Sequence, residues 1–486
     1  MRRARVVPSS LILSELMLAA DPVPAVRLGR VHFVGLGGAG MSGIARIMLT
    51  RGITVSGSDS APSALLDELT ALGASAHIGH AAANLGDLGA GDTLVVSSAI
   101  RPDNPELTEA SRRGMRVLHR AAALASVMSG RRVIAVAGTH GKTTTTSMLT
   151  TVLRECGADP SYVIGGILTE TGLGAEDGTG MDFVAEADES DGSFLLLSPD
   201  VAVITNVEAD HLDNYESLAD IEAAFTTFGG RISGIVLICA DDPGAERVAA
   251  RLDPARVRRY GESPHADYRL SEVRSHGMSI GFTVSADRGP FGEILSRMTV
   301  AVPGHHNALN ATAAFAAAVE LGFAPPRVAA ALAGYRGARR RMELKGEADG
   351  ILVLDSYAHH PTELAADLRA ARDIADGGRV IAVFQPHLFS RTRIFATDFG
   401  AALGLADQAL VLDVYAARED PEPGVTGQLV VDAVPGGRAR FMPDRAQVTE
   451  VVAALAAPGD VVLTMGAGDV TRLGPQLVDT LRGRRE

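Results

Sequence analysis

A glycine-rich turn followed by one lysine and a run of threonines is the stretch of this sequence best suited to chemistry. An apolar segment at 131–137 leads into the turn, and a threonine-rich segment follows it. Glycines let backbone N–H groups face an anion, the next helix adds its positive end, and a lysine adds a point charge for the outer phosphates. The segment therefore predicts a nucleotide phosphate site made of Gly138, Thr139, His140, Gly141, Lys142, Thr143 and Thr144.

The spacing of this turn, G-x-x-G-K-T, is about two residues shorter than the common phosphate loop, so we interpret it as a variant. The alternative is an ordinary strand-to-helix turn that carries a surface lysine. Lysine occurs only at Lys142 and Lys345, while every other long basic side chain is arginine. A lysine within the turn is therefore better explained by a function than by surface composition.

Two acidic clusters follow the turn, each after an apolar stretch of strand type. Residues 186–191 read Glu-Ala-Asp-Glu-Ser-Asp, and residues 206–213 read Asn-Val-Glu-Ala-Asp-His-Leu-Asp. Open α/β sheets place ligands at the carboxyl ends of their strands, and a hard cation that bridges phosphates takes oxygen ligands from one or two carboxylates. A solvated acidic loop is the alternative for each cluster taken alone. Candidate metal ligands are Glu186 and His211 besides Thr143, and Asp188, Asp210 and Asp213 are available to orient them.

The elements that must position these residues alternate between strand and helix. Expected strands at 31–35, 53–59 and 93–98 and a helix at 41–51 predict a Rossmann-like first domain with a parallel sheet. Gly35, Gly37 and Gly40 fit G-x-G-x-x-G, and Asp59 follows about 20 residues later, as in a dinucleotide fingerprint. A turn without a ligand is the alternative. Because a second nucleotide site lies downstream, we expect a phosphate-bearing ligand other than NAD here.

The second half of the chain carries two further polar groups. His306, Asn307 and Asn310 lie on adjacent turns of an alanine-rich helix, where they either meet a base or phosphate or cap the helix. Expected strands at 351–355 and 380–384 both end in polar residues. A carboxylate suits an ammonium group and arginines suit a carboxylate, which predicts a zwitterion site among Asp355, His359, His387, Arg391 and Arg393.

Composition excludes several classes of partner. The 486 residues carry a net charge of −13, which argues against nucleic acid or an anionic membrane surface. Hydrophobic residues make up 46% and charged residues 21%, as in globular domains, and no apolar run reaches the roughly 18 residues of a membrane span. Cys156 and Cys239 are isolated and are expected to be reduced thiols. Glu15 interrupts an apolar N-terminal stretch, so we expect an extension rather than an export signal.

Taken in order, the motifs resemble those of the Mur ligase family. The resemblance runs from about residue 28 to the C-terminus. Its motifs are GLGGAGMSGIA at 35–45, GTHGKTTTT at 138–146, EADESD at 186–191, TNVEADHLD at 205–213, HNALN at 306–310, YAHHPTE at 357–363, FQPH at 384–387, SRTR at 390–393 and MGAGD at 465–469.

The resemblance implies three α/β domains behind an N-terminal extension at 1–26. A Rossmann-like domain at 27–128 would bind a UDP-sugar, a central domain of phosphate-loop type at 129–336 would bind ATP, and a Rossmann-like domain at 337–486 would bind the amino acid. It implies a cytoplasmic ligase of peptidoglycan precursor synthesis, as a monomer or homodimer. Such an enzyme joins L-alanine to the carboxylate of UDP-N-acetylmuramate through an acyl phosphate and converts ATP to ADP and phosphate.

The resemblance also implies a role for each matching residue. Catalytic roles fall to Lys142, His211, Arg340, Arg341 and His359. The residues implied to bind the adenosine part of ATP are His306, Asn307 and Asn310. Those implied to bind Mg²⁺, or Mn²⁺ in its place, are Thr143, Glu186 and His211. The residues implied to bind the UDP-sugar are Gly35, Gly37, Gly38, Gly40, Asp59, Ser97 and Ser98. Those implied to bind the amino acid are Asp355, Tyr357, His359, His387 and Arg391.

Three positions depart from the family pattern and keep alternatives open. Ser356 replaces a second acid, and Met342 replaces an aromatic residue. Leu388 replaces an arginine that could pair with the carboxylate of the amino acid. A lysine that could be carbamylated is absent between 142 and 345. The alternatives are a sibling ligase that attaches a preformed peptide, a ligase for a specialised metabolite, and a non-catalytic nucleotide sensor or NAD-dependent dehydrogenase. The FQPH and SRTR segments favour a single amino acid as substrate.

Overall fold

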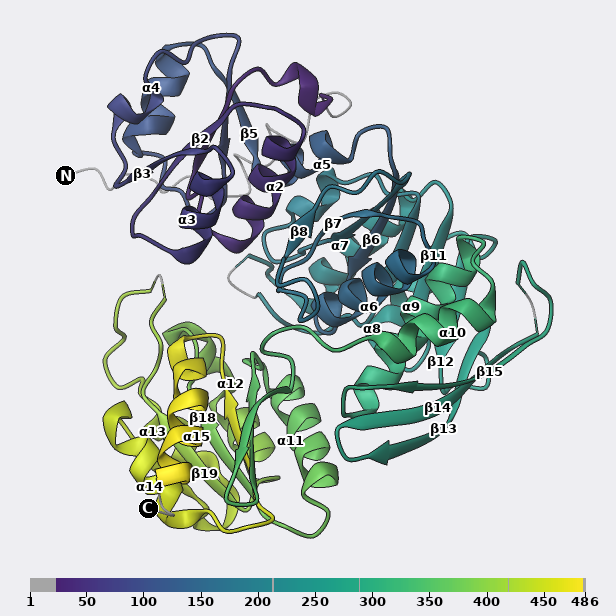
Figure 1. Ribbon diagram of the computed structural model, residues 1–486, viewed down its shortest axis with the longest axis vertical. Helices are drawn as coiled ribbons and strands as arrows, with labels where there is room; N and C mark the ends of the chain where they lie inside the picture. Colours follow the sequence, from purple (N-terminus) through teal and green to yellow (C-terminus); the bar gives the residue numbers. More distant parts are fainter. Residues whose placement is uncertain (1–22, 212–213, 288, 418, 484–486) are drawn as a thin grey trace. The chain divides into compact units, whose positions relative to one another are not determined.

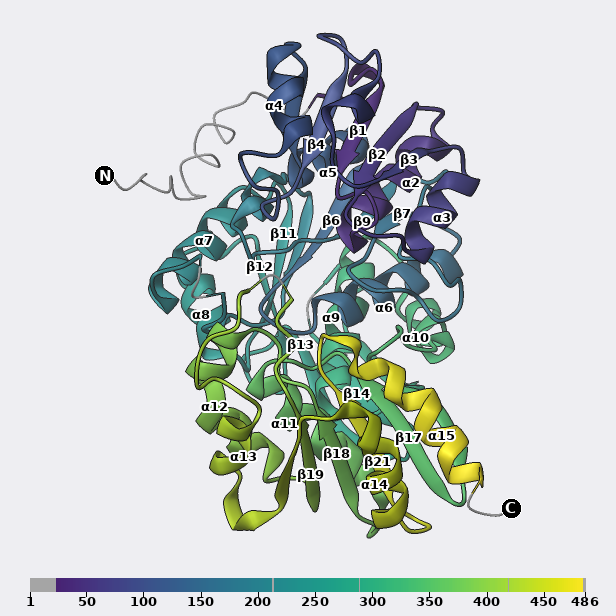
Figure 2. The ribbon, with the colours of Figure 1, turned by 90° about the vertical axis from the view of Figure 1, so that its left-hand side faces the viewer.

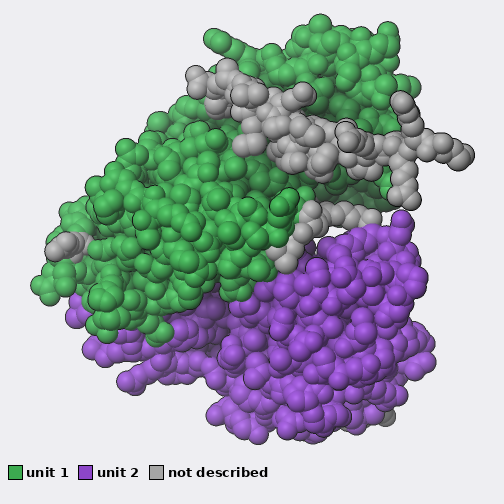
Figure 3. Space-filling model, turned by 180° about the vertical axis from the view of Figure 1, so that it is seen from behind, with its two compact units in different colours: residues 1–269, 285–294, 312–331 green, residues 270–284, 295–311, 332–486 purple. Residues whose placement is uncertain are grey.

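The computed structural model describes residues 23–211, 214–287, 289–417 and 419–483. Most of the expected N-terminal extension, residues 1–22, lies outside these ranges. Within them, no helix is both long and apolar enough to cross a lipid bilayer. The chain forms two compact units (Figure 3): unit 1 comprises residues 1–269, 285–294 and 312–331, and unit 2 comprises residues 270–284, 295–311 and 332–486.

Unit 1 begins with a five-stranded parallel sheet in the order β3-β2-β1-β4-β5 (Figure 1). Val31 and Phe33 of β1 pack in the core that includes helices α2 and α5, whereas Val34 packs with Leu94 and Met115 on the other face. This alternation is what a strand buried on both faces requires. The elements are β1 (Val31–Val34), α2 (Ala39–Thr50), β2 (Val55–Asp59), α3 (Ala64–Ala71), β3 (Ser75–Ile78), β4 (Thr93–Val96), α4 (Pro105–Arg112), β5 (Arg116–His119) and α5 (Arg120–Met128).

A ten-stranded sheet follows, in the order β15-β14-β13-β12-β11-β10-β6-β9-β7-β8. Strand β6 lies between β10 and β9 and pairs with both in parallel, so the carboxyl ends of the three strands share one edge. The elements of this sheet within unit 1 are β6 (Arg132–Ala137), α6 (Lys142–Glu155), β7 (Ser161–Val163), β8 (Ala175–Glu176), β9 (Asp182–Glu186), β10 (Val201–Ile204), α7 (Leu218–Gly230), β11 (Ile235–Cys239), α8 (Pro243–Ala249) and β12 (Val257–Gly261).

Five elements contain residues of both units or lead from one to the other. They are β13 (Tyr268–His276), β14 (Ser279–Ala286), β15 (Ile294–Val300), α9 (His305–Glu320) and α10 (Pro325–Gly334).

Unit 2 contains a six-stranded sheet in the order β16-β17-β21-β18-β19-β20 (Figure 2). Only the edge strand β16 is antiparallel among these described strands. Leu354 packs on the face with α11 and α12, and Val353 packs on the face with α14 and α15. The elements are β16 (Glu343–Ala348), β17 (Ile351–Ser356), α11 (Pro361–Ala375), β18 (Val380–Phe384), α12 (Phe389–Leu403), β19 (Gln408–Leu412), α13 (Gln428–Ala433), β20 (Ala439–Met442), α14 (Val448–Leu455), β21 (Val461–Met465) and α15 (Leu473–Gly483).

The predicted α/β class with mainly parallel sheets is confirmed. The helix expected at 41–51 spans Ala39–Thr50, and the strand expected at 351–355 spans Ile351–Ser356. The domain bounds predicted from the sequence remain a prediction.

Candidate functional site

The glycine-rich turn connects the end of β6 to the start of α6. Gly138 has φ 133°, and a Cβ there would lie 2.0 Å from Thr205 Oγ1, so no larger residue fits. Gly141 is the N-cap of α6 in the left-handed region with φ 83°, and it has no side chain to cap the helix. Backbone N–H groups at the start of such a helix form an anion site. The turn therefore has the geometry of a phosphate loop despite its shorter spacing.

Lys142 is the first residue of α6, and its side chain is held at the turn. Its Nζ donates to the carbonyls of Gly138 and Thr139 at 2.6 and 3.1 Å and lies 2.9 Å from Glu189 Oε1. Burial opposes the ammonium charge, but the carboxylates of Glu189, Asp188 and Glu186 outweigh burial and raise the pKa of Lys142. A permanent positive charge therefore stands where phosphate oxygens would arrive.

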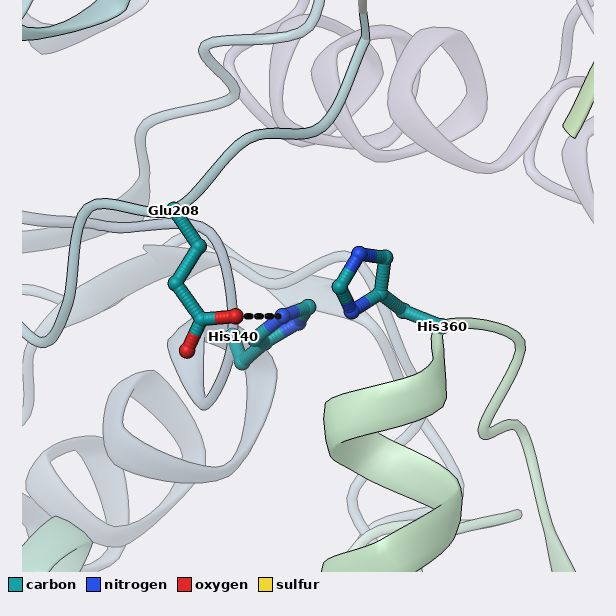
Figure 4. A group of neighbouring side chains, drawn as sticks. All are labelled: His140, Glu208 and His360. Carbon is teal, nitrogen blue, oxygen red and sulfur yellow. Dashed lines mark ion pairs between the residues drawn. The ribbon is translucent and has the colours of Figure 1, made fainter. Parts of the chain in front are cut away.

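The neighbouring loop after β10 clamps the phosphate turn. Asn206 accepts from the backbone N–H of His140 at 2.7 Å and donates back to the carbonyl of His140 at 3.0 Å. The His140 ring pairs with Glu208 at 3.6 Å, the ion pair drawn in Figure 4. His360, also drawn there, belongs to unit 2 and is the N-cap of α11. The second acidic cluster therefore supports the turn as well as supplying candidate ligands.

Two of the expected metal ligands, Thr143 and Glu186, lie side by side. Thr143 Oγ1 is 3.2 Å from Glu186 Oε1, and the backbone N–H of Gly165 donates to Glu186 Oε2 at 2.8 Å. A hydroxyl and a carboxylate next to a phosphate loop are hard oxygen donors of the kind Mg²⁺ prefers. The residues present would therefore suit a magnesium ion.

The third expected ligand, His211, lies beside other acids. Its Nε2 is 3.8 Å from Glu189 Oε1 and 3.6 Å from Asp210 Oδ2. Its backbone φ of 53° is left-handed, which for a residue with a Cβ stores strain. The loop therefore holds the imidazole near Glu189 with a strained backbone at His211. Asp213, expected to orient a ligand, lies outside the described residues.

Glu189 was not among the residues chosen from the sequence, although it touches both Lys142 and His211. It is 2% exposed as a residue. Burial raises its pKa to about 7, against the attraction of Lys142 and with the repulsion of Asp188. Its neighbours in the same acidic cluster were considered as ligands, and only the direction of each side chain distinguishes them. Because adjacent residues point in different directions, spacing alone does not identify Glu189 as the partner of the lysine.

Two residues at the junction of β5 and α5 also escaped prediction. Arg120 pairs with Asp188 at 3.0 Å, and His119 lies 3.5 Å from Asp191. A Cβ at Gly40 would lie 2.7 Å from Arg120 Nη1, so the missing side chain at Gly40 makes room for the guanidinium. Arg120 therefore lies between the first glycine turn and the acidic cluster of the phosphate site. These contacts join residues far apart in the sequence, and no local motif signals them.

The first glycine turn has the geometry expected of a Rossmann-like strand-to-helix connection. Gly35 has φ 86°, and Gly38 is the N-cap of α2 without a side-chain cap. The backbone N–H of Gly37 donates to Asp59 Oδ2 at 2.9 Å, which joins the turn to the end of β2. Ser97 and Ser98 follow β4, the strand on the other side of β1. The residues expected to bind the UDP-sugar thus gather at the carboxyl edge of one sheet.

A buried acid below this edge joins three elements. Glu106 on α4 accepts from Ser58 Oγ at 2.6 Å and from Asn84 Nδ2 at 2.6 Å, and its carboxylate lies 3.7 Å from His32 Nε2. Burial favours the neutral form, but His32, Ser58 and Asn84 outweigh it and lower the pKa of Glu106 to about 2. The carboxylate therefore stabilises the end of β2, directly before Asp59.

We expect Glu106→Gln to lower the free energy of unfolding by about 2 kcal/mol at neutral pH, the size of hydrogen bonds to a charged group. The folded pKa is about 2 and the reference value is 4.5. The advantage of the wild type is therefore complete above pH 4.5 and shrinks as the pH falls from 4.5 toward 2. Thermal unfolding followed by circular dichroism at a series of pH values from neutral down to about pH 3 measures this difference and its decline.

The matched control is Glu109→Gln on the same helix. Glu109 pairs with Arg112 and with Arg113 on the same helix, and such solvent-accessible pairs contribute little to stability. Equal destabilisation in both variants, or a Glu106→Gln effect that persists undiminished at acidic pH, would contradict the assignment.

The residues predicted to bind the adenosine part of ATP lie at the start of α9, in unit 2. Asn307 Nδ2 donates to the carbonyl of Pro303 at 2.6 Å, and Asn310 Nδ2 donates to Asn307 Oδ1 at 3.1 Å. His306 packs against Gly304, where a Cβ would lie 2.6 Å from the ring. Burial lowers the pKa of His306 to about 4, so the ring is neutral at physiological pH. The two amides thus brace the helix start, and a neutral imidazole lies beside them.

The residues expected to bind the amino acid gather at the carboxyl edge of the unit 2 sheet. Asp355 is fully buried at the end of β17 and accepts from Thr464 and Thr471, both at 2.7 Å. Arg340 Nε lies 3.4 Å from Asp355 Oδ2, and its guanidinium carbon lies 4.9 Å from the Tyr357 ring centre. The resemblance predicts a catalytic role for Arg340 and an amino-acid-binding role for Asp355, and the structure brings the two side chains together.

Four rings form a row along this edge, which we call the aromatic row: Tyr357, His359, His387 and Tyr415. Their consecutive centroids are 5.2, 6.0 and 5.8 Å apart, and His387 stacks on Tyr415 with an interplanar angle of 14°. A Cβ at Gly468 would lie 2.7 Å from Tyr415, so the absence of a side chain at this glycine leaves room for the ring. Arg391, also expected here, is buried in the first turn of α12. Tyr415 was not predicted, because no motif marks the segment after β19.

Comparison with known proteins decides the family. Three family models match: "Mur ligase family, catalytic domain" at residues 30–132, "Mur ligase middle domain" at 136–318 and "Mur ligase, glutamate ligase domain" at 340–468. The chain belongs to the Mur ligase family. It is 56% identical to the UDP-N-acetylmuramate–L-alanine ligase of Thermobifida fusca, over 96% of this chain and 100% of that protein. It is 57% identical to the enzyme of the same name from Kineococcus radiotolerans, over 94% and 97% of the two chains.

Solved structures of Mur ligases resemble most of the chain. The UDP-N-acetylmuramate-alanine ligase MurC of Thermotoga maritima is 29% identical, with a TM-score of 0.78 over 94% of this chain and 99% of that chain. The murein peptide ligase of Psychrobacter arcticus is 27% identical, with a TM-score of 0.68 over 93% and 99% of the two chains. The predicted membership of the Mur ligase family is therefore confirmed, and the roles assigned to individual residues remain predictions.

Proposed function

We propose that this Mur ligase joins L-alanine to the carboxylate of UDP-N-acetylmuramate at the expense of ATP, in peptidoglycan precursor synthesis. The observation that carries the proposal is the 56% identity to a UDP-N-acetylmuramate–L-alanine ligase along the whole of that relative. The phosphate loop, the paired Thr143 and Glu186, and the aromatic row supply the chemical groups that such a reaction needs. The substrates are small molecules, and a monomer or homodimer remains the predicted state.

The proposed assignment follows the predicted domains. Residues 27–128 bind the sugar nucleotide, residues 129–336 bind ATP, and residues 337–486 bind the amino acid. Mg²⁺ is the proposed metal, with Mn²⁺ as a substitute. Bound there, the ion would spread the negative charge of the phosphates, and Thr143 and Glu186, with His211, would hold it.

The reaction has two steps. A carboxylate oxygen of the sugar nucleotide attacks the γ-phosphorus of ATP, and the bond to ADP breaks, which gives an acyl phosphate. The amine of L-alanine then attacks the acyl carbon, phosphate leaves with the electrons of the C–O bond, and the nitrogen loses a proton. A free carboxylate is a poor acylating group. Phosphorylation makes one of its oxygens part of a good leaving group, phosphate. Lys142 stabilises the phosphoryl charge, and no covalent protein nucleophile is needed.

The test is to incubate the purified protein with ATP, Mg²⁺ and UDP-N-acetylmuramate and to add each amino acid separately while phosphate release is followed. L-Alanine should stimulate release most, and mass spectrometry should detect the alanyl sugar nucleotide. Oxygen-18 placed in the substrate carboxylate should pass into phosphate. If a preformed peptide replaces alanine as the best acceptor, the sibling ligase is correct. If no acceptor stimulates release, the ligase proposal fails.

Within this proposal, Tyr415→Ala should raise KM for L-alanine about three- to tenfold, because a stacked aromatic pair contributes roughly 0.5–1.5 kcal/mol. The loss of the ring frees His387, which Tyr415 stacks upon at 5.8 Å. Initial rates over a range of alanine concentrations give the measurement. Tyr415→Phe keeps the ring and should behave as the wild type. A KM for L-alanine that stays unchanged in Tyr415→Ala would remove this residue from the amino-acid site.

A further inference from the structure

Asp367 is a buried acid on α11 for which the proposed mechanism has no use. It is 8% exposed as a residue and lies on the inner face of the helix. Its Oδ2 accepts the hydroxyl hydrogen of Ser356, the last residue of β17. Its Oδ1 lies 3.7 Å from Nε2 of His306 on α9. Each carboxyl oxygen therefore faces a different element of unit 2.

The Ser356 side of this arrangement shapes the start of the aromatic row. Ser356 Oγ donates to Asp367 and accepts from the backbone N–H of Ala358 at 3.0 Å. Ser356 lies between Asp355 and Tyr357, two residues of the expected amino-acid set. The Asp367 carboxyl group therefore fixes the turn that presents those residues.

The His306 side shapes the expected adenosine site. The ring is backed by Gly304, where a Cβ would lie 2.6 Å from His306 Cε1 and 3.2 Å from Ala370 Cβ. Ala370 is three residues after Asp367, so both lie on one face of α11. The imidazole thus lies against the surface that carries Asp367.

Charges around Asp367 and His306 argue against an ion pair between the two side chains. Burial raises the pKa of Asp367 to about 7, opposed by Ser356 and Arg341 and assisted by Glu363. Burial also lowers the pKa of His306 to about 4. At neutral pH the imidazole is uncharged, so Asp367 acts on it through its position, with Oδ1 at 3.7 Å from His306 Nε2.

We propose that Asp367 is a positioning residue of the ligase reaction, which fixes His306 on the ATP side and the turn at Ser356 on the amino-acid side from one buried carboxyl group. The inference rests on the proposed function, because it assigns these two elements to the two substrates. It predicts that one substitution on α11 weakens the binding of both ATP and L-alanine, although Asp367 itself contacts neither substrate.

The experiment compares Asp367→Ala with the wild type by two measurements: the ATP dissociation constant from calorimetry without acceptor, and KM for L-alanine from phosphate release. Loss of the hydrogen bond to Ser356, of about 1 kcal/mol, should raise KM for L-alanine about fivefold. Loss of the 3.7 Å contact with His306 should raise the ATP dissociation constant by more than about twofold. Asp367→Asn retains hydrogen-bonding groups and should show the smaller effect. Ser356→Ala should raise KM for L-alanine and leave the ATP constant within about twofold.

The matched control is Asp373→Asn on the same helix. Asp373 is exposed and accepts from Ser275 at 2.7 Å, so both constants should stay at wild-type values. The proposal is overturned if Asp367→Ala changes neither constant, or only one, by more than about twofold. If Asp367→Ala does not fold, Ser356→Ala decides, and an unchanged KM for L-alanine overturns the proposal. A wild type that binds ATP but never releases phosphate would instead defeat the proposed function.

Discussion

Lys142→Ala is expected to lower kcat for phosphate release by about a hundred- to a thousandfold. Lys142 Nζ is held at 2.6 and 3.1 Å from two carbonyls of the phosphate turn, so the charge is in place before substrate arrives. A preorganised group that stabilises developing charge contributes about 3–4 kcal/mol to the transition state, which corresponds to this change in rate. Phosphate release at saturating ATP, UDP-N-acetylmuramate and L-alanine measures the effect.

The fold should survive the loss of Lys142, although Glu189 loses its cation at 2.9 Å. Burial already raises the pKa of Glu189 to about 7, so the carboxyl group takes up a proton instead of remaining charged and unpaired. Lys142→Ala combined with Glu189→Gln should therefore be as stable as the single variant and equally inactive. Arg154→Ala, at the far end of α6, is the control and should retain wild-type turnover. Activity of Lys142→Ala within tenfold of the wild type would contradict the role of the lysine.

The sequence predicts the fold and the phosphate turn well, because both depend on local patterns. Apolar runs that end in glycine or in acids predict buried parallel strands with polar carboxyl ends, and β6, β9 and β10 have this form. Gly138 and Gly141 adopt positive φ, as a tight turn into α6 requires. Such features are encoded within a few residues and need no knowledge of long-range contacts.

Contacts between distant segments are not predictable in the same way. Arg120 meets Asp188 across 68 residues of sequence, and its room comes from the absent side chain of Gly40. Arg340 and Asp355 carry opposite charges and lie close enough to pair, which the separate roles assigned to them do not anticipate. The family resemblance identifies which motifs matter, but packing decides which side chains within a motif face each other.

Glu186→Gln is expected to raise the half-saturating Mg²⁺ concentration at least about tenfold and to lower kcat, since replacement of a coordinating group or its support typically weakens metal binding 10- to 100-fold. The substitution keeps the shape of the side chain and removes its charge. Glu186 lies 3.2 Å from Thr143 Oγ1 at the start of α6, so the lost charge is next to the hydroxyl proposed to share the ion. Phosphate release measured over a Mg²⁺ titration at fixed ATP gives both constants.

Position can be separated from charge at the same site. A Cβ at Gly165 would lie 2.6 Å from Glu186 Oε1, so Gly165→Ala should push the carboxylate away from Thr143 while every charge remains. Its Mg²⁺ titration should shift in the same direction as that of Glu186→Gln, and Glu176→Gln on strand β8 should leave the titration unchanged. If Glu186→Gln titrates as the wild type, Glu186 is not a ligand. If only Gly165→Ala shifts, the loop after β7, rather than the carboxylate, governs metal binding.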